Sequence, residues 1–257
     1  MNMDKLLLFD VDGTLVDSGQ EIDGHMVTTL KELKLLGYHI GIAGGGNIDK
    51  ILNQMKNEIV FEHYFSECGC VYYRNIGSDQ LCIEKVYEKN IREHSFYPYI
   101  DKLIKKALDF LSKVEYTLTG NFIDLRTGII YISLIGMSAN ESERKYFKEY
   151  DAKYKIRGQL LKLLNSYAKT MGIENDISIL EGGSVGIAIY PCEWDKIQVL
   201  SSLSQYKEIH FFGDKYEEGG NDYGLIHDKS VKGHKVNNKH ETYVALKKIF
   251  YTTMNNN

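Results

Sequence analysis

Residues 6–14 read Leu-Leu-Leu-Phe-Asp-Val-Asp-Gly-Thr, so four apolar residues run directly into two carboxylates that stand two positions apart. A short apolar run that ends in polar residues is typical of a buried parallel strand. We therefore predict a strand over residues 5–10. Ligands of open α/β sheets bind beyond the carboxyl ends of the strands, so Asp10 and Asp12 are expected at a ligand site.

Two neighbouring carboxylates can divide the work of phosphoryl transfer. Asp10 would attack phosphorus, while Asp12 would lie beside the leaving oxygen as general acid and later as general base. Gly13 permits a tight turn whose backbone N–H groups can face a phosphate. The alternative is a plain Asp/Gly surface turn, and the apolar run before it and Thr14-Leu15 after it argue against that reading.

A second acidic cluster follows another predicted strand, over residues 208–212. Asp214 stands at its end, and a Gly-Gly-Asn-Asp segment then supplies Asn221 and, eight residues after Asp214, a second acid in Asp222. Mg²⁺ prefers hard oxygen ligands and retains some water. We therefore predict a Mg²⁺ site. Its expected ligands are Asp10, the backbone carbonyl of Asp12, and Asp214, with Asn221 or Asp222 bound directly or in support.

The spacing of apolar residues predicts the remaining elements. Near the N-terminus it predicts a helix over 23–36, a strand over 38–43, a turn at Gly44-Gly45-Gly46 and a helix from about Asn47. Near the C-terminus it predicts helices over 194–203 and 240–250. This alternation of strand and helix is a doubly wound α/β pattern with a parallel sheet and helices on both faces.

The middle of the chain has a different pattern, a hairpin flanked by helices. Strands are expected over 122–125, 129–133, 177–180 and 185–190, and helices over 100–114, 141–150 and 157–171. This indicates a separate α+β layer. We expect a discontinuous Rossmann-like core of residues 1–82 and 190–257 with an inserted α+β cap over residues 83–189, and we expect tyrosine-rich residues 87–99 on the cap surface or in a subunit contact.

Composition excludes several classes of protein. The formal net charge of −4 offers no basic surface for nucleic acid or for an anionic membrane, and no apolar run approaches the length that a bilayer requires. No stretch near the N-terminus reads as a signal peptide, so a cytoplasmic location is expected. The four cysteines lack the spacing of a zinc site and are expected to be reduced, and His63, His210 and His234 are expected to be structural.

Taken together, the motifs resemble those of the haloacid dehalogenase superfamily, and more closely its eukaryotic-type phosphomannomutase branch. The matching segments run in order over nearly the whole chain. They are residues 9–15, 41–45, 122–128, 133–136 with 143–144, 194–196, and 211–215 through 219–222. The resemblance implies a Rossmann-like core with a mobile α/β cap, and it suggests a homodimer formed through the cap.

The resemblance also implies a role for each matching residue. Asp10 would be the nucleophile, Asp12 the acid and base, and Asp214 a metal ligand. Lys196 would neutralise the transferring phosphoryl group. Arg126 and Arg144 match cap arginines that hold the distal phosphate of the substrate, a task that suits the bidentate guanidinium. The remaining residues expected to contact the substrate are Gly45, Gly46, Asn47 and Asn221.

The chain also departs from the family pattern. No cation follows the first motif in residues 17–20, Gly46 replaces a hydroxyl, and Cys68 replaces an asparagine. In the cap an arginine, a serine and an aspartate of the mutases are replaced by Met137, Gly186 and Ala188, respectively. A mutase must hold a bisphosphate intermediate in a closed, dry cavity, which needs a strong second anion site.

Three hypotheses follow from these departures. The first is a Mg²⁺-dependent phosphatase that hydrolyses a phosphate monoester of a small polar metabolite, such as a sugar phosphate, through an aspartyl-phosphate. The second is a true phosphomannomutase that interconverts hexose 6-phosphate and hexose 1-phosphate and compensates for the lost groups elsewhere, for instance with Lys153 or Arg157. The third is a non-enzymatic binding protein, against which the complete set of carboxylates argues.

Overall fold

The computed structural model describes residues 4–77 and 80–255. The chain divides into two compact units, which we call the core and the cap. The core comprises residues 1–89 and 194–257, and the cap is the single insertion Asn90–Glu193. No helix in the described part of the chain is long and apolar enough to cross a membrane.

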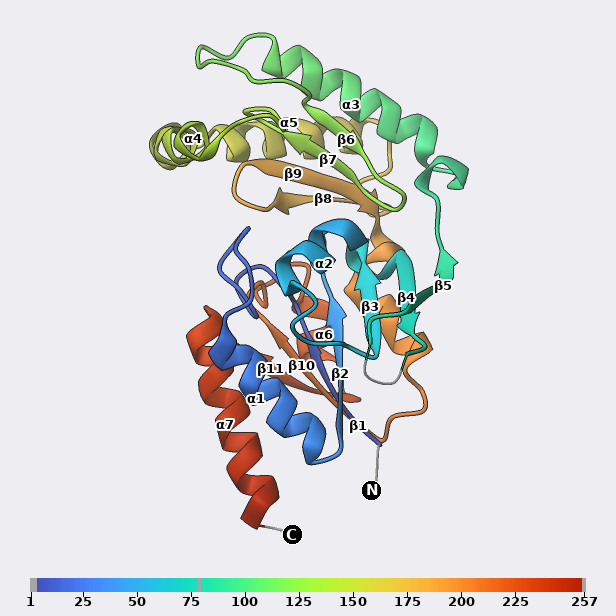
Figure 1. Ribbon diagram of the computed structural model, residues 1–257. Coiled ribbons are helices and arrows are strands. Elements are labelled where there is room, and N and C mark those ends of the chain that lie inside the picture. Colours follow the sequence, from blue (N-terminus) through green and yellow to red (C-terminus); the bar gives the residue numbers. More distant parts are fainter. Residues whose placement is uncertain (1–3, 78–79, 256–257) are drawn as a thin grey trace. The chain divides into compact units, whose positions relative to one another are not determined.

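A seven-stranded sheet forms the centre of the core, in the order β11-β10-β1-β2-β3-β4-β5. Its strands are β1 (Lys5–Phe9), β2 (Tyr38–Ala43), β3 (His63–Ser66), β4 (Val71–Asn75), β5 (Ile83–Glu88), β10 (Glu208–Gly213) and β11 (Val231–Lys235). β11, β10, β1, β2 and β3 run parallel, whereas β4 and β5 form an antiparallel extension (Figure 1). β1 lies between β10 and β2, so the two acidic motifs follow the carboxyl ends of adjacent parallel strands.

Both faces of β1 are buried, which is why its sequence is continuously apolar rather than alternating. Leu7 and Phe9 join a hydrophobic cluster on one face of the sheet, and Leu6 and Leu8 join a second cluster on the other face. The central strand is therefore anchored from both sides. This holds the residues that follow Phe9 in place.

Helices cover the core sheet. They are α1 (Gly24–Leu35), α2 (Ile48–Met55), α6 (Tyr223–His227) and α7 (Lys239–Asn255), with 3₁₀ turns at Glu67–Gly69 and Lys196–Ser202. A further 3₁₀ turn, Cys192–Trp194, spans the boundary between cap and core. Asp23 and Asn47 accept hydrogen bonds from the first turns of α1 and α2, as N-cap residues do. Leu246 of α7 lies in the same hydrophobic cluster as Leu30 of α1, so these two helices share one face of the sheet.

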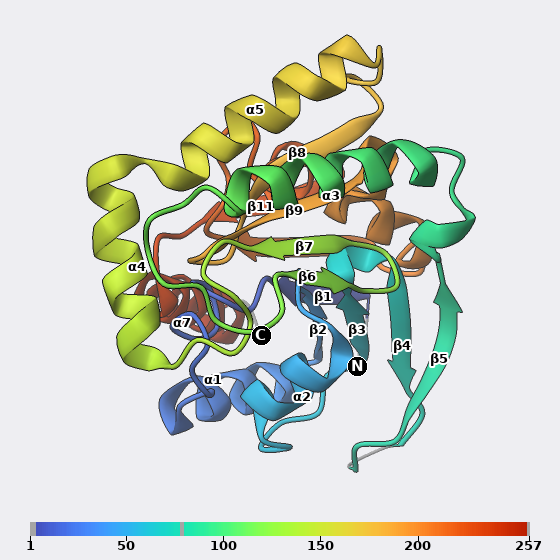
Figure 2. The same ribbon diagram turned by 90° about the horizontal axis from the view of Figure 1, so that it is seen from above.

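The cap is a four-stranded antiparallel sheet with helices on one face. Its sheet order is β6-β7-β9-β8, and Figure 2 shows the helices lying over these strands. The elements are a 3₁₀ turn at Ile91–Glu93, α3 (Tyr97–Leu111), β6 (Ile123–Leu125), β7 (Ile130–Ser133), α4 (Glu141–Tyr154), α5 (Ile156–Thr170), β8 (Ile177–Gly182) and β9 (Gly186–Pro191). The expected α/β core with an inserted α+β cap is confirmed; the core sheet is mostly parallel and the cap sheet is antiparallel.

Two expectations about the elements need correction. The cap expected over 83–189 includes residues 83–88, but these form β5, which pairs with β4 of the core sheet. Tyr87 therefore lies on the core, with its ring 5.5 Å from that of Tyr72. The helix expected over 194–203 is present as a 3₁₀ helix, Lys196–Ser202, and its N-cap residue Asp195 accepts a hydrogen bond of 2.9 Å from the Ile197 backbone.

Candidate active site

Three side chains from separate parts of the sequence meet in the core where β1 and β10 end. The Lys196 ammonium forms ion pairs with the carboxylates of Asp10 and Asp222, and its Nζ lies 2.6 Å from Asp222 Oδ1. Lys196 and Asp222 are completely buried. The second Asp222 oxygen accepts a hydrogen bond of 3.0 Å from the Lys215 backbone N–H. Such contacts fix the Lys196 ammonium directly beside the expected nucleophile.

Asp214 completes an acidic cluster that can hold a metal ion. Carboxylate oxygens of Asp10, Asp214 and Asp222 all lie within 4.8 Å of one another. Asp214 Oδ1 is buried and has no hydrogen-bond partner among the described residues. When all three carboxylates are ionised, Lys196 compensates for only one of the three negative charges. A hard divalent cation such as Mg²⁺ therefore fits this set of donors.

Burial, the largest cause, raises the pKa of Asp10 to about 7, and the neighbouring carboxylates of Asp222 and Asp214 act in the same direction. The Lys196 charge and hydrogen bond oppose this rise. Burial also raises the pKa of Asp214, with Asp222 as the next cause. A cation bound among these groups would favour their ionised forms.

Asp12 lies outside this cluster. Its carboxylate forms an ion pair with Lys50 and accepts hydrogen bonds from Gln54 Nε2 at 2.9 Å and from the Gly19 backbone at 2.8 Å. Burial alone would raise the pKa of Asp12, but Lys50 and these hydrogen bonds outweigh it and the pKa lies below its usual value. In this arrangement Asp12 is ionised, which suits a group that accepts a proton.

Gly13 lets the chain turn directly after Asp12. Its φ is +89°, and a Cβ at this position would lie 2.6 Å from Asp214 Oδ2. No other residue type combines this backbone conformation with so close an approach of a carboxylate. The loop is closed by a hydrogen bond of 2.7 Å from the Gly13 N–H to the Val16 carbonyl.

The turn after β2 lies against a second tight turn, residues 67–69. The backbone N–H groups of Glu67 and Cys68 donate to the carbonyls of Gly46 and Gly44, each at 2.9 Å. A Cβ on Gly45 would lie 3.7 Å from Asn221 Nδ2 and 3.8 Å from Cys68 Sγ. Asn221 Oδ1 is buried without a partner among the described residues, so it offers an acceptor here.

The sequence comparisons identify the family. The defining pattern of the eukaryotic phosphomannomutases matches residues 26–252 of the 257. The chain belongs to this family. A phosphomannomutase of Schizosaccharomyces pombe is 33% identical over 95% of this chain and 94% of its own length, and one of Saccharomyces cerevisiae is 32% identical over 95% and 94%.

Solved structures show the same fold at lower sequence identity. The Plasmodium falciparum IMP-nucleotidase aligns over 96% of this chain and 62% of its own, with a TM-score of 0.70 and 16% identity. A trehalose-6-phosphate phosphatase related protein aligns over 98% and 100%, with a TM-score of 0.56 and 16% identity. The phosphomannomutase family and its neighbours share the haloacid dehalogenase fold, and the chain is a phosphotransfer enzyme of that superfamily.

The two arginines that match the phosphomannomutase cap are both held by neighbouring groups of the cap. Arg126 Nε lies 2.7 Å from Asp124 Oδ2. Arg144 donates to the backbone carbonyls of Ala139 at 2.9 Å and Met137 at 3.1 Å. Both guanidinium groups are therefore held in fixed orientations on the cap.

The core brings together most of the site residues predicted from the sequence. Two of them, Asp12 and Asn47, make contacts other than those expected. The Asp12 carboxylate points to Lys50 and is not part of the cluster that could bind a metal. The side-chain oxygen of Asn47 caps α2 by accepting from the Lys50 backbone at 3.0 Å, so this oxygen is already engaged. Lys50 and Gln54 themselves were not predicted. Their spacing of four residues on a helix after the glycine turn is the signal that could have indicated them.

Proposed function

We propose that the chain interconverts hexose 6-phosphate and hexose 1-phosphate through a phosphoryl group carried on Asp10. The observation that carries this proposal is the buried Asp10–Lys196–Asp222 arrangement beside Asp214, in a chain that matches phosphomannomutases over almost its full length. This was the second of our sequence hypotheses, and the relatives support it better than the phosphatase that the sequence alone favoured.

The residues act in a defined order. A carboxylate oxygen of Asp10 attacks phosphorus, and the bond from phosphorus to the sugar oxygen breaks. Lys196, already paired with Asp10, lies where it can neutralise the charge on the transferring group. Asp12 exchanges a proton with the sugar hydroxyl, and it accepts that proton when the hydroxyl attacks the aspartyl-phosphate.

A bound Mg²⁺ would be held by Asp10, Asp214 and Asp222, and it would neutralise phosphoryl oxygens. The buried Asp214 oxygen without a partner supports this assignment. For Asp12 we keep the backbone carbonyl as a proposed ligand, because the carboxylate is engaged with Lys50. A cytoplasmic location and a homodimer formed through the cap also remain predictions.

A phosphatase is the second candidate, and the cap favours it. Gly186 and Ala188 offer no polar side chain on β9, and Met137 is 37% exposed where the mutases carry an arginine. A weaker hold on the second phosphate would allow water to resolve the aspartyl-phosphate. The same core would then release inorganic phosphate.

Phosphorus NMR separates the candidates. The protein is incubated with Mg²⁺ and mannose 1-phosphate or glucose 1-phosphate, with and without the matching hexose 1,6-bisphosphate. The proposal predicts the 6-phosphate isomer, formed only when the bisphosphate is present. Release of inorganic phosphate without isomer would replace the mutase by the phosphatase. If neither product forms and the Asp10→Asn variant behaves identically, both enzymatic candidates fail.

A further inference from the structure

The aromatic ring of Tyr131 occupies the space where side chains at two cap positions would otherwise stand. A Cβ on Gly186 would lie 2.3 Å from Tyr131 Cζ, and a Cβ on Gly182 would lie 2.9 Å from Tyr131 Cε2. The Tyr131 hydroxyl donates a hydrogen bond of 3.0 Å to the Gly182 carbonyl. Side chains at positions 182 and 186 are therefore incompatible with the ring as it lies.

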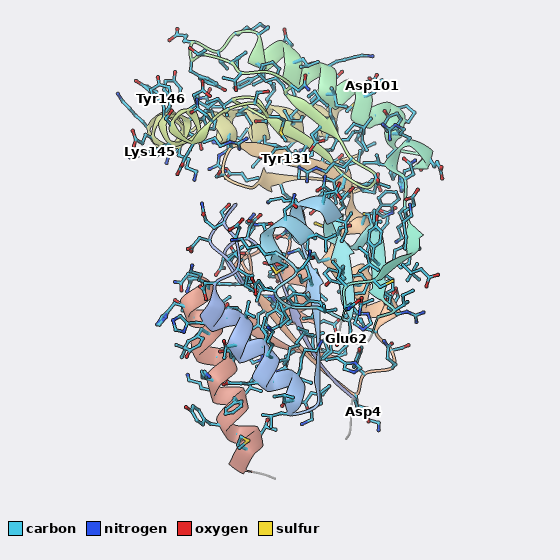
Figure 3. All side chains as sticks on the ribbon, viewed as in Figure 1. Asp4, Glu62, Asp101, Tyr131, Lys145 and Tyr146 are labelled. Carbon is cyan, nitrogen blue, oxygen red and sulfur yellow. The ribbon has the colours of Figure 1, made fainter. Side chains whose placement is uncertain are left out.

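Tyr131 belongs to the face of the cap sheet that the cap helices leave uncovered. Its neighbours on β7, Ile130 and Ile132, are completely buried, and successive residues of a strand point to opposite faces. Opposite Tyr131 on β9 stands Ala188, which is only partly buried. Figure 3 labels Tyr131 among the strands of the cap and Tyr146 on α4.

The Tyr131 ring also contacts a cation, the guanidinium of Arg126. The central carbon of the Arg126 guanidinium lies 5.1 Å from the centre of the Tyr131 ring, within the range of a cation–π contact. Asp124 binds the Nε of the same group, so two contacts fix the plane of the guanidinium. Burial raises the pKa of Tyr131, and the charges of Arg126, Arg144 and Arg157 oppose that rise.

We propose that Tyr131 is a positioning residue that holds Arg126 for an anionic group of the substrate, the phosphate of a sugar phosphate. This inference rests on the proposed function, because it assumes a phosphorylated sugar. A side chain at position 186 would displace the ring, and with it the support of Arg126, and its Cβ would also lie 2.5 Å from the Ile132 carbonyl oxygen. At this end of the cap, the Arg126 guanidinium would bind the phosphate of the substrate, and side chains at positions 182 and 186 would not take part.

The first test measures the binding of mannose 6-phosphate to the full chain by titration calorimetry. Tyr131→Phe keeps the ring face and loses only the hydroxyl, so the dissociation constant should stay within about twofold of that of the natural protein. Tyr131→Leu fills space without a π face, so binding should weaken about tenfold. Equal affinity for the Leu variant and the natural protein would overturn the inference, and so would equal losses in the Phe and Leu variants.

The second test is a double-mutant cycle on the predicted steric conflict. Gly186→Ser should weaken binding about tenfold in the natural background, because the new Cβ collides with the ring. In the Tyr131→Ala background the same substitution should cause a clearly smaller loss, because only the contact of the new Cβ with the Ile132 carbonyl, at 2.5 Å, remains. An equal loss in both backgrounds would contradict the coupling between the ring and position 186.

Two further measurements keep these tests decisive. Thermal unfolding shows whether each variant is folded at the assay temperature, and Tyr131→Met replaces Tyr131→Leu if the latter is not. Binding is measured separately from turnover, so intact binding without isomer or phosphate would defeat the proposed function and leave the inference standing. Absence of mannose 6-phosphate binding by the natural protein would overturn the inference.

Discussion

The buried ammonium of Lys196 depends on two carboxylate partners. It is completely buried and pairs with two carboxylates, and removing one partner of a buried ion pair costs about 3–5 kcal/mol. Lys196→Met should lower the free energy of unfolding by about that amount, because Asp10 and Asp222 lose their shared cation. Urea unfolding in the presence of EDTA measures it.

Asp10→Asn is the matched control for this prediction. It removes one carboxylate from an acidic cluster and keeps the pair between Lys196 and Asp222, so its cost should be clearly smaller. If the Asn variant were as unstable as the Met variant, the ion pairs would not be what stabilises the cluster.

Asp214 is expected to make the site responsive to Mg²⁺. A cation that binds only the folded state at about 100 times its dissociation constant stabilises by about 2.7 kcal/mol, which corresponds to several degrees in a protein of this size. Mg²⁺ should raise the thermal midpoint of the natural protein, and Asp214→Asn should abolish the rise. Asp12→Asn should keep it, since that carboxylate binds Lys50 instead. A shift that survives Asp214→Asn would place the metal elsewhere.

The sequence was most informative about residues whose role follows from their position at a strand end. Asp10 and Asp214 could be predicted because both follow an apolar strand directly. Lys50 and Tyr131 were not predicted, although the four-residue spacing of Lys50 and Gln54 was a signal for the first of them. The contact between Lys50 and Asp12 depends on how α2 lies on the sheet, and the fit of Tyr131 to Gly186 depends on the register of β7 with β9.

At the level of elements, the turn after β1 depends on Gly13. Gly13→Ala would strain a backbone at φ +89° and press a Cβ against Asp214, so it should cost about 1–3 kcal/mol of stability and remove the phosphotransfer activity. Gly172→Ala is the control, because Gly172 has a φ of +69° and open space around it. Comparable activity losses in the two variants would mean that the close approach to Asp214 is unimportant.

β3 carries a buried histidine that makes stability depend on pH. His63 contacts the hydroxyls of Tyr72 at 2.8 Å and Tyr206 at 2.7 Å, and burial lowers the pKa of His63 to about 4. In the unfolded chain His63 is protonated as the pH falls below about 6.5, whereas in the folded chain it is protonated only near pH 4. The contribution of His63 to stability is therefore present above pH 6.5 and is lost as the pH falls towards 4.

The size of this effect can be measured at two pH values. The shift accounts for about 2 kcal/mol between pH 7 and pH 5, and urea unfolding of His63→Gln should lose that much less stability over this interval than the natural protein. His240→Gln, at an exposed position, should behave like the natural protein. An unchanged pH dependence for His63→Gln would show that the histidine titrates normally in the folded state.

On the scale of the whole molecule, the sequence predicted two units but placed their boundaries several residues away from those of the structure. Residues 83–88 have no apolar alternation, since Ile83 and Tyr87 are half-buried and the residues between them are exposed. Such an edge strand is held by backbone hydrogen bonds with its neighbour β4, and backbone hydrogen bonds cannot be predicted from a pattern of apolar residues. Among the parallel strands, β1, β2 and β10 were predictable because burial on two faces makes them largely apolar, whereas β3 and the mostly exposed β11 lack this pattern and were not predicted.

The central claim is that Asp10 carries the phosphoryl group, and trapping that intermediate tests it most directly. The protein is mixed with Mg²⁺ and glucose 1,6-bisphosphate, quenched in acid and digested, and the peptide that contains Asp10 and Asp12 is analysed by mass spectrometry with fragmentation. The account predicts the mass of one phosphoryl group on Asp10, absent from the Asp10→Asn variant. Phosphate on another residue, or the same modification in the Asn variant, would contradict it.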